Sequence, residues 1–243
     1  MPDDPKNLGP GDSVVSLCNV ISTNGKQLKD ISPKGWNTIV FTESMGLLGD
    51  TPFISGEIVI LDAINLLNEL ALHGDEVVEL TFKTPQKKEI EFVGKVYQID
   101  VSEFETSRTV SLKFCSAEKV VADQLKFNRA YREVLYSDMA QDIFAPLNKI
   151  GNKKIYVEPT KNKGSFIVNN QSPLDALNDI VKVARSESYM GANYVFFEQS
   201  DGIFQFVSIE KLVDPSIVQP TMKYYYDAPS SDSKSPTGLV RLK

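Results

Sequence analysis

Residues 164–212 read GSFIVNNQSPLDALNDIVKVARSESYMGANYVFFEQSDGIFQFVSIEKL, and this segment carries the most organised pattern in the sequence. It opens with an apolar run at 165–168, which predicts a strand. Ser172 is a favourable N-cap, and Pro173 suits the first helical position because its missing N–H would have no partner there. Apolar residues then recur on one helical face; they are Leu174, Leu177, Ile180, Val181 and Ala184. The first half of the segment therefore predicts a strand followed by a capped helix.

The second half of the segment predicts a β-hairpin. Two aromatic and β-branched runs, Tyr194–Glu198 and Phe204–Ser208, flank the dipeptide Asp201-Gly202. Asp-Gly between two such runs is a strong hairpin signal, because these residues favour tight turns. Strand, capped helix and hairpin then form one unit, which a short turn at 210–212 closes.

The same ordered combination resembles the central region of baseplate hub proteins of contractile-tailed, T-even-like bacteriophages. The residues that carry this resemblance are the Ser172-Pro173 helix start, the run 194–198, the Asp201-Gly202 turn and the run 204–208. Upstream, residues 52–85, PFISGEIVILDAINLLNELALHGDEVVELTFKTP, also resemble the first barrel of that family. The resemblance therefore spans roughly residues 53–212.

The resemblance implies a structural role in the virion. A hub of this family is a homotrimer that joins the tail tube above it to a central spike protein below it. Each subunit supplies two similar barrels, and DNA passes through the ring as cargo. The sequence ends at Lys243 without a second barrel, so we expect the N-terminal portion of a hub. Such a protein is made in the host cytoplasm and resides in the tail baseplate.

Ahead of the helix and hairpin, turn signals separate six short strands. The expected strands cover residues 13–21, 36–41, 57–62, 78–82, 89–101 and 110–114. The alternation of apolar and polar residues breaks in the fifth strand, and a β-bulge around Gly94 or Val96 would restore it. Six strands of this length predict a small barrel or sandwich. The expected fold class is therefore α+β, with an N-terminal β-barrel or sandwich followed by an α/β insertion domain.

The pattern changes after residue 116, where we expect a domain boundary. Residues 117–125 permit a helix, and Ser137-Asp138 predicts the start of another, whose end Pro146 is expected to strain. Residues 229–238 are rich in Ser, Pro and Asp, which indicates a linker. The expected divisions are a tail-hub β-barrel at 1–116, an α+β insertion domain at 117–214, and an extended strand with a flexible tail at 215–243.

Residues 57–62 differ from the other expected strands because they are apolar on both alternating faces. Such a strand needs a cover on each face. One alternative is burial on both sides within the domain. The other is a partner chain on one side, which makes Ile58, Val59, Ile60 and Leu61 candidates for a subunit interface.

Composition limits the other classes of function. The 243 residues are 42% hydrophobic and 24% charged, as in soluble globular proteins. The net charge of −6 argues against a dedicated nucleic-acid surface, which needs clustered Lys and Arg. No stretch approaches the ~20 apolar residues that cross a bilayer, so we expect no membrane insertion. Cys18 and Cys115 are too few for a disulfide framework or a cysteine-rich zinc site.

The sequence predicts no catalytic, metal or cofactor site. His73 is the single histidine, so triads and histidine metal clusters would all depend on it. Walker, Gly-x-Gly-x-x-Gly and His-Glu-x-x-His motifs are absent from the sequence. We therefore expect a non-enzymatic protein. Two alternatives to the phage hub remain open. One is a β-rich module that binds a glycan through Tyr224-Tyr225-Tyr226, and the other is a hub or spike component of a contractile secretion system.

Overall fold

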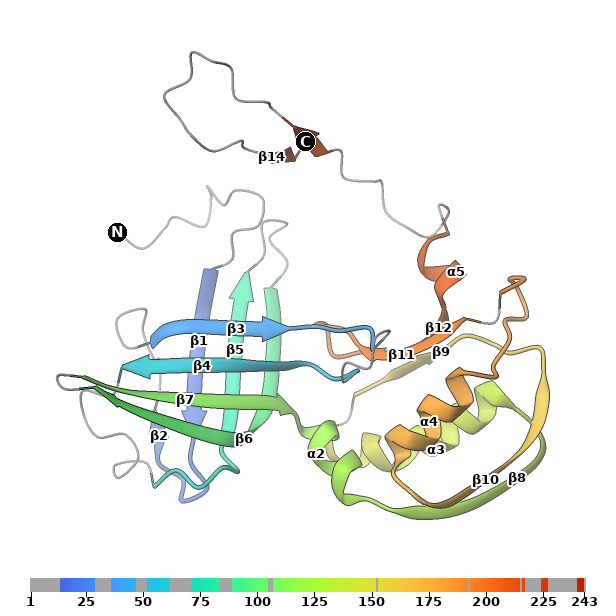
Figure 1. Ribbon diagram of the computed structural model, residues 1–243, viewed down its shortest axis with the longest axis horizontal. Coiled ribbons are helices and arrows are strands. Elements are labelled where there is room, and N and C mark those ends of the chain that lie inside the picture. The colour runs from blue at the N-terminus through green and yellow to red at the C-terminus, as the bar shows by residue number, and fades with distance from the viewer. Residues whose placement is uncertain are drawn as a thin grey trace.

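The computed structural model describes residues 14–28, 36–46, 52–61, 71–83, 89–104, 107–151, 153–191, 193–214, 216, 224–226 and 240–242. Within these residues the fold is mixed α+β (Figure 1). It contains a seven-stranded sheet, three smaller sheets and four helices. Residues 1–13, residues 62–70 and most of the tail expected at 215–243 lie outside the described residues.

The large sheet contains all six strands that the sequence predicts and one short addition, β2. Its strands are β1 (Val14–Ile21), β2 (Gln27–Leu28), β3 (Trp36–Thr42), β4 (Ser55–Leu61), β5 (Val77–Lys83), β6 (Glu89–Phe104) and β7 (Ser107–Ser116). Their order is β2-β1-β5-β6-β7-β4-β3, and every neighbouring pair is antiparallel. The outermost strands of this order are β2 and β3, so within the described residues the sheet is an antiparallel half-barrel, which confirms in part the predicted small barrel or sandwich.

The long strand β6 bends the sheet. Its first half pairs with β5 from Glu89 to Lys95, and its second half pairs with β7 from Gly94 to Phe104. The register shifts between Val96 and Gln98, which confirms the predicted bulge near Val96. Figure 1 shows the result, with β3, β4 and β7 crossing in front of β1 and β5. The concave side encloses a core that includes Ile58, Leu80, Phe92 and Leu112.

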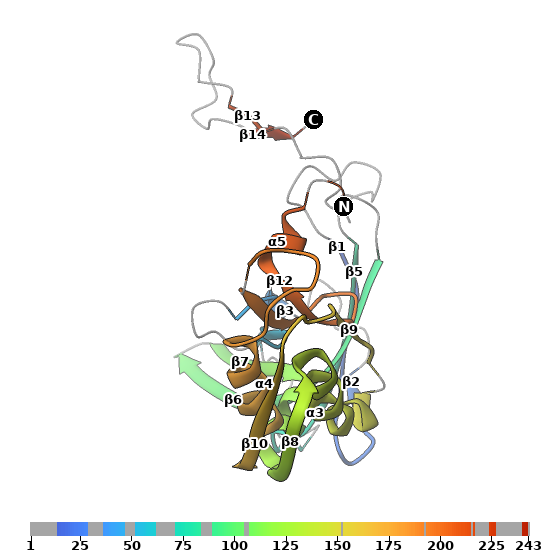
Figure 2. The ribbon, with the colours of Figure 1, turned by 90° about the vertical axis from the view of Figure 1, so that its right-hand side faces the viewer.

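The chain then forms a smaller α+β part. Its elements are α2 (Ala117–Gln124), β8 (Phe127–Leu135), α3 (Tyr136–Gly151), β9 (Ile155–Val157), β10 (Lys163–Gln171), α4 (Pro173–Val181), β11 (Tyr194–Glu198), β12 (Phe204–Ser208) and α5 (Ile209–Leu212). β8 pairs with β10, and Figure 2 shows this ribbon beside α3 and α4. β11, β12 and β9 form a second small sheet, in which β12 and β9 are parallel.

The predicted helix and hairpin are confirmed. The hydroxyl of Ser172 accepts a hydrogen bond from the amide of Asp175 at 3.1 Å, and Pro173 begins α4. Gly202 has φ of +79° in the turn between β11 and β12, where a side chain would be strained. Leu177 and its helical neighbours pack on the hairpin in the core of the α+β part.

Two local expectations were wrong or incomplete. Residues 126–135 carried no strand prediction, yet they form β8 because the ribbon lies against α3 and places Tyr131 and Val134 at the core. Pro146 was expected to strain the end of its helix, but α3 continues to Gly151 with Pro146 inside it.

In the tail, β13 (Tyr224–Tyr226) pairs with β14 (Val240–Leu242).

Candidate functional site

The predicted interface residues lie on β4 and alternate between the two faces of the sheet. Ile58 and Ile60 belong to the core of the half-barrel, so they are covered within the chain. On the opposite, outer face, Val59 is half-buried and Leu61 is 52% exposed. Only Val59 and Leu61 therefore have surface to offer another chain, and for them the subunit interface stays a prediction.

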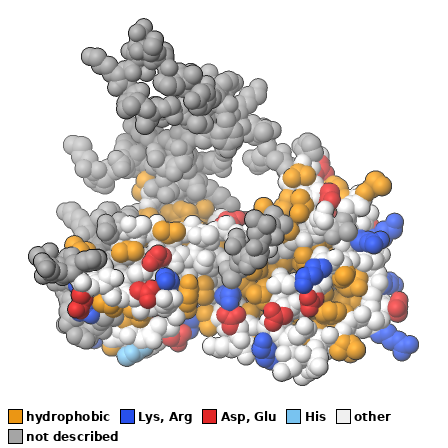
Figure 3. All heavy atoms as spheres, in the orientation of Figure 1, with side chains coloured by type: hydrophobic (Ala, Val, Ile, Leu, Met, Phe, Trp, Pro, Cys, Tyr) orange, Lys and Arg blue, Asp and Glu red, His pale blue; other side chains and the backbone are white. Residues whose placement is uncertain are grey.

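Three strands contribute to the outer face around Val59, which we call the β4 face. In the sheet register Val59 lies between Thr38 of β3 and Ser111 of β7. Val40 of β3 is also exposed, and the hydroxyl of Ser111 donates to the carboxylate of Glu57. Figure 3 shows this side of the molecule, where hydrophobic side chains are scattered among polar ones. Isolated aliphatic groups among hydroxyls fit the mixed composition of protein interfaces.

Glu198, the last residue of β11, fastens the half-barrel to the α+β part. Its carboxylate accepts a hydrogen bond from the amide of Ile54 at 3.0 Å and another from the hydroxyl of Ser116. Its own amide donates to the carbonyl of Pro52 at 2.8 Å. Pro52 and Ile54 precede β4, and Ser116 ends β7. One residue therefore bonds to two neighbouring strands of the half-barrel.

Lys153 brings a positive charge to the same junction. Its Nζ lies 2.5 Å from the carboxylate of Glu198 and 2.8 Å from that of Glu118, and both acidic side chains are fully buried. Burial raises the pKa of Glu198, and the charge of Lys153 opposes that rise. Burial lowers the pKa of Lys153, but the two carboxylates outweigh it and leave that pKa raised. Two buried carboxylates thus share one ammonium group. Removing these charges from water costs free energy, and close hydrogen bonding between them offsets that cost.

Phe53 adds an apolar fastening next to this charged one. It lies just before β4, yet its ring is buried in the core of the α+β part. The ring meets Phe196 edge-on at 6.4 Å between centroids and Phe204 at 5.6 Å. Edge-to-face aromatic pairs add stability beyond the area they bury. The half-barrel therefore inserts the side chain of Phe53 into the hydrophobic core of the α+β part of the same chain.

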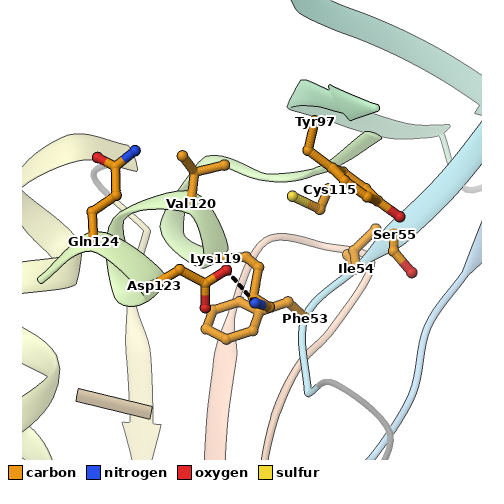
Figure 4. Close-up of a pocket in the computed structure, with 9 residues that line it drawn as sticks. All are labelled: Phe53, Ile54, Ser55, Tyr97, Cys115, Lys119, Val120, Asp123 and Gln124. Carbon is orange, nitrogen blue, oxygen red and sulfur yellow. Dashed lines mark hydrogen bonds and ion pairs between the residues drawn. The ribbon is translucent and has the colours of Figure 1, made fainter. Parts of the chain in front are cut away.

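A pocket of about 420 Å³ lies beside the junction (Figure 4). Its lining comes from the start of β4, the bulge of β6, the end of β7 and α2; the residues are Phe53, Ile54, Ser55, Tyr97, Cys115, Lys119, Val120, Asp123 and Gln124. Lys119 and Asp123 form an ion pair along α2. Burial raises the pKa of the Cys115 thiol to about 11, so the thiol is protonated near neutral pH. Cys115 is therefore not an activated nucleophile.

His73 lies on the surface of the loop before β5. Its backbone amide and that of Gly74 donate to the buried carboxylate of Glu76, so the side chain of Glu76 fixes the loop.

Within the described residues, no group of three or more His, Cys, Asp or Glu side chains is placed to hold a metal ion. No helix in the described part of the chain is long and apolar enough to cross a membrane.

Sequence reasoning did not single out Lys153 or Glu118, and it assigned Glu198 only the end of a strand. One signal was present, since Glu198 closes an otherwise apolar run in which both faces are buried. A charge at that position needs a buried partner. Nothing in the sequence indicated which cation would reach it, because Lys153 is 45 residues away.

The fold resembles those of solved phage tail proteins. The 43 kDa tail protein of prophage MuSo2 from Shewanella oneidensis superposes with a TM-score of 0.53 at 11% identity, covering 79% of this chain and 54% of that one. The tail protein from Neisseria meningitidis MC58 gives a TM-score of 0.45 at 15% identity, with 87% and 59% covered. The c3393 protein of E. coli, a type VI secretion system component with similarity to phage T4 tail proteins, gives 0.41 at 8% identity, with 80% and 46% covered.

No protein-family profile and no curated protein matches the sequence. The chain spans about half the length of the MuSo2 tail protein that it matches. That similarity exceeds a TM-score of 0.5 and covers most of this chain, so the two proteins share a fold. The structural comparison thereby confirms the resemblance to phage tail proteins that the sequence indicated.

Proposed function

We propose that this chain is a structural, non-enzymatic subunit of a phage tail baseplate hub, a trimeric ring that joins the tail tube to the central spike. The observation that carries the proposal is the fold shared with the MuSo2 tail protein over 79% of this chain. In this role the protein resides in the virion, and DNA passes through the ring without being bound specifically.

The junction between the half-barrel and the α+β part suits this mechanical role. A hub lies between two assemblies that transmit force, so its parts gain from being held as one body. Glu198 of the α+β part accepts hydrogen bonds from Ile54 and Ser116 of the half-barrel, and Phe53 crosses the junction in the other direction. The proposed domain boundary at residue 116 therefore separates two units that are fastened by buried polar and aromatic contacts.

We assign the β4 face to contact with a neighbouring subunit or with the tube. It offers Val40, Val59 and Leu61 on a sheet whose other side is filled by its own core. Burying exposed aliphatic side chains between subunits stabilises an assembly in proportion to the apolar area removed from water.

Light scattering after size-exclusion chromatography tests the proposal on the purified chain, alone and mixed with the tube and spike proteins of the same tail. We expect a trimer that both partners strengthen. Leu61→Asp should weaken it, since a charge would be buried in the contact. Ile167→Asp, at an exposed position of β10, is the matched control. A strict monomer that binds neither partner would overturn the proposed function.

A further inference from the structure

Charge is divided unevenly along this chain. Residues 1–116 contain 17 Asp and Glu against 10 Lys and Arg, a net charge of −7. Residues 117–214 contain 13 acidic and 12 basic residues, a net charge of −1. Three of those 13 acids, Glu118, Glu158 and Glu198, are buried, and the mostly buried Lys153 pairs with two of them. The remaining charges of residues 117–214 nearly balance, whereas residues 1–116 are acidic overall.

On the outer side of the half-barrel, an exposed valine lies beside two carboxylates, and Lys95, two residues further along β6, pairs with Asp75. Val93, on the outer side of β6, is 55% exposed. It pairs in register with Glu79 of β5, and Glu91 lies two residues away on the same face. Among the described residues neither Glu79 nor Glu91 has a basic side chain within ion-pair distance; Glu79 accepts a hydrogen bond from Asn19. We call Glu79, Glu91 and Val93 the acidic face.

A second exposed valine lies near basic residues just after the end of α4. Val183 is 46% exposed, and three exposed basic residues lie on the chain segments next to it: Arg185 two residues away, and Lys161 and Lys163 on either side of Asn162, which bonds to the carbonyl of Val183. Within the described part of the chain these three side chains have no acidic partner at ion-pair distance. We call Val183 and these three residues the basic tip.

The backbone of the basic tip is held in place. The amide of Lys161 donates to the carbonyl of Arg185 at 2.9 Å. Asn162 donates to the carbonyl of Val183 and accepts from the amide of Arg185, both at 2.9 Å. The segments before β10 and after α4 are thus joined, and the three cations are presented on a defined framework.

The two surfaces lie on different parts of the molecule. Figure 1 shows β5 and β6 in the left half of the picture, and α4 and β10 toward the right end. A contact between two different surfaces is heterologous, so it joins each copy to the next and closes into a ring when the rotation fits. We propose that the basic tip of one copy docks on the acidic face of the next, with Val183 and Val93 at the centre of the contact. This inference rests on the proposed function, because it adds a contact between neighbouring copies of the hub ring to the one proposed for the β4 face.

A second copy of this chain fits the basic tip better than a nucleic acid does. Asp179 lies 3.0 Å from Lys182 and Glu187 is exposed nearby, so acidic groups border the cations. A phosphate backbone would meet those acids, whereas the acidic face offers two carboxylates and an apolar centre. Complementary charge mainly orients the partners and speeds their encounter, and the valines supply apolar contact.

A charge swap tests the contact in the full chain. Arg185→Glu alone, or Glu91→Lys alone, places like charges opposite each other and should weaken self-association about tenfold. The double variant R185E/E91K restores opposite charges in every contact of the ring, so it should recover the wild-type association. Lys126→Glu, at an exposed position outside both surfaces, is the matched control for a charge reversal. Double-stranded DNA tests the alternative that the basic tip binds nucleic acid. If the wild type binds this DNA, and R185E loses the DNA binding but keeps its self-association, the proposal is overturned.

Cross-linking gives a second readout that does not depend on affinity. The variant V93C/V183C should form covalent dimers and closed rings under oxidation, and each single variant should yield dimers at most. If the wild-type trimer forms with tube and spike but neither the charge variants nor the cysteine pair affects it, this contact is wrong and the proposed hub function stands. If no assembly forms at all, both fail.

Discussion

The Nζ of Lys153 lies 2.5 Å from the carboxylate of Glu198, a residue that also accepts hydrogen bonds from Ile54 and Ser116 of the half-barrel. The same ammonium group lies 2.8 Å from Glu118. The connection between the two parts of the molecule therefore depends on a buried ionic group. Burying these charges costs free energy, and their mutual attraction offsets that cost. The offset requires that the lysine and both carboxylates are present, because removing one leaves an unpaired buried charge.

Replacing Lys153 by Met should destabilise the protein by about 3–5 kcal/mol, because two buried carboxylates lose their cation. Urea denaturation measures this free energy. Lys154→Met is the matched control at the exposed neighbouring position, and we expect it to change stability by less than about 0.5 kcal/mol. Equal effects of the two substitutions would show that the ion pairs do not stabilise the junction.

The raised pKa of Glu198 predicts a pH-dependent difference between the wild type and Glu198→Gln. A carboxyl whose pKa is higher in the folded state contributes stability below its ordinary value of 4.5, and this contribution is lost as the pH rises through the folded pKa. Glutamine cannot ionise, so the variant should gain stability relative to the wild type as the pH rises from about 4.5 through that raised pKa. Thermal melts across that range measure the trend. Glu187→Gln controls for the loss of a surface carboxylate, and a difference that falls with pH would contradict the prediction.

Local patterns predicted most of the fold because most of its elements carry their own signals. The Ser172-Pro173 start, the Asp201-Gly202 turn and the break near Val96 all lie where the sequence placed them. β8 was missed because most of its side chains are exposed and carry no apolar alternation. Its strand conformation comes from pairing with β10, about 30 residues away, and sequence periodicity does not report such pairing.

The junction was harder to predict than the elements it joins. Ile58 and Ile60 were proposed for an interface because the run 57–62 is apolar on both faces, but a sequence does not say which chain provides each cover. Glu198 acquires its role from Ile54, 144 residues earlier in the chain. Contacts of that separation depend on the packing of whole units, so local sequence patterns do not identify the partners.

Leu177→Asp should unfold the α+β part at temperatures where the wild type is stable. Leu177 is fully buried in the core that α4 forms with the hairpin, and an unpaired carboxylate there has no hydrogen-bond partner to offset its burial. We expect a loss of several kcal/mol, measured by thermal and urea denaturation. Asn178→Asp adds the same charge at the exposed neighbouring position and should leave the melting temperature nearly unchanged. A melt shifted by less than a couple of degrees in Leu177→Asp would show that this face is not core.

The two buried thiols report on two places in the half-barrel, one beside the junction and one inside its core. Burial raises the pKa of Cys115 to about 11 and that of Cys18 to about 12, so at pH 8 only about a thousandth or less of either thiol is ionised. Both should therefore resist a thiol reagent in the native protein and react at once after unfolding. In Lys153→Met we expect Cys115, at the end of β7 beside the junction, to react faster than Cys18, which lies inside the half-barrel on β1. Mass spectrometry of the labelled peptides distinguishes the two sites. If both thiols accelerate together, the substitution unfolds the whole chain, and the junction does not open as a separate unit.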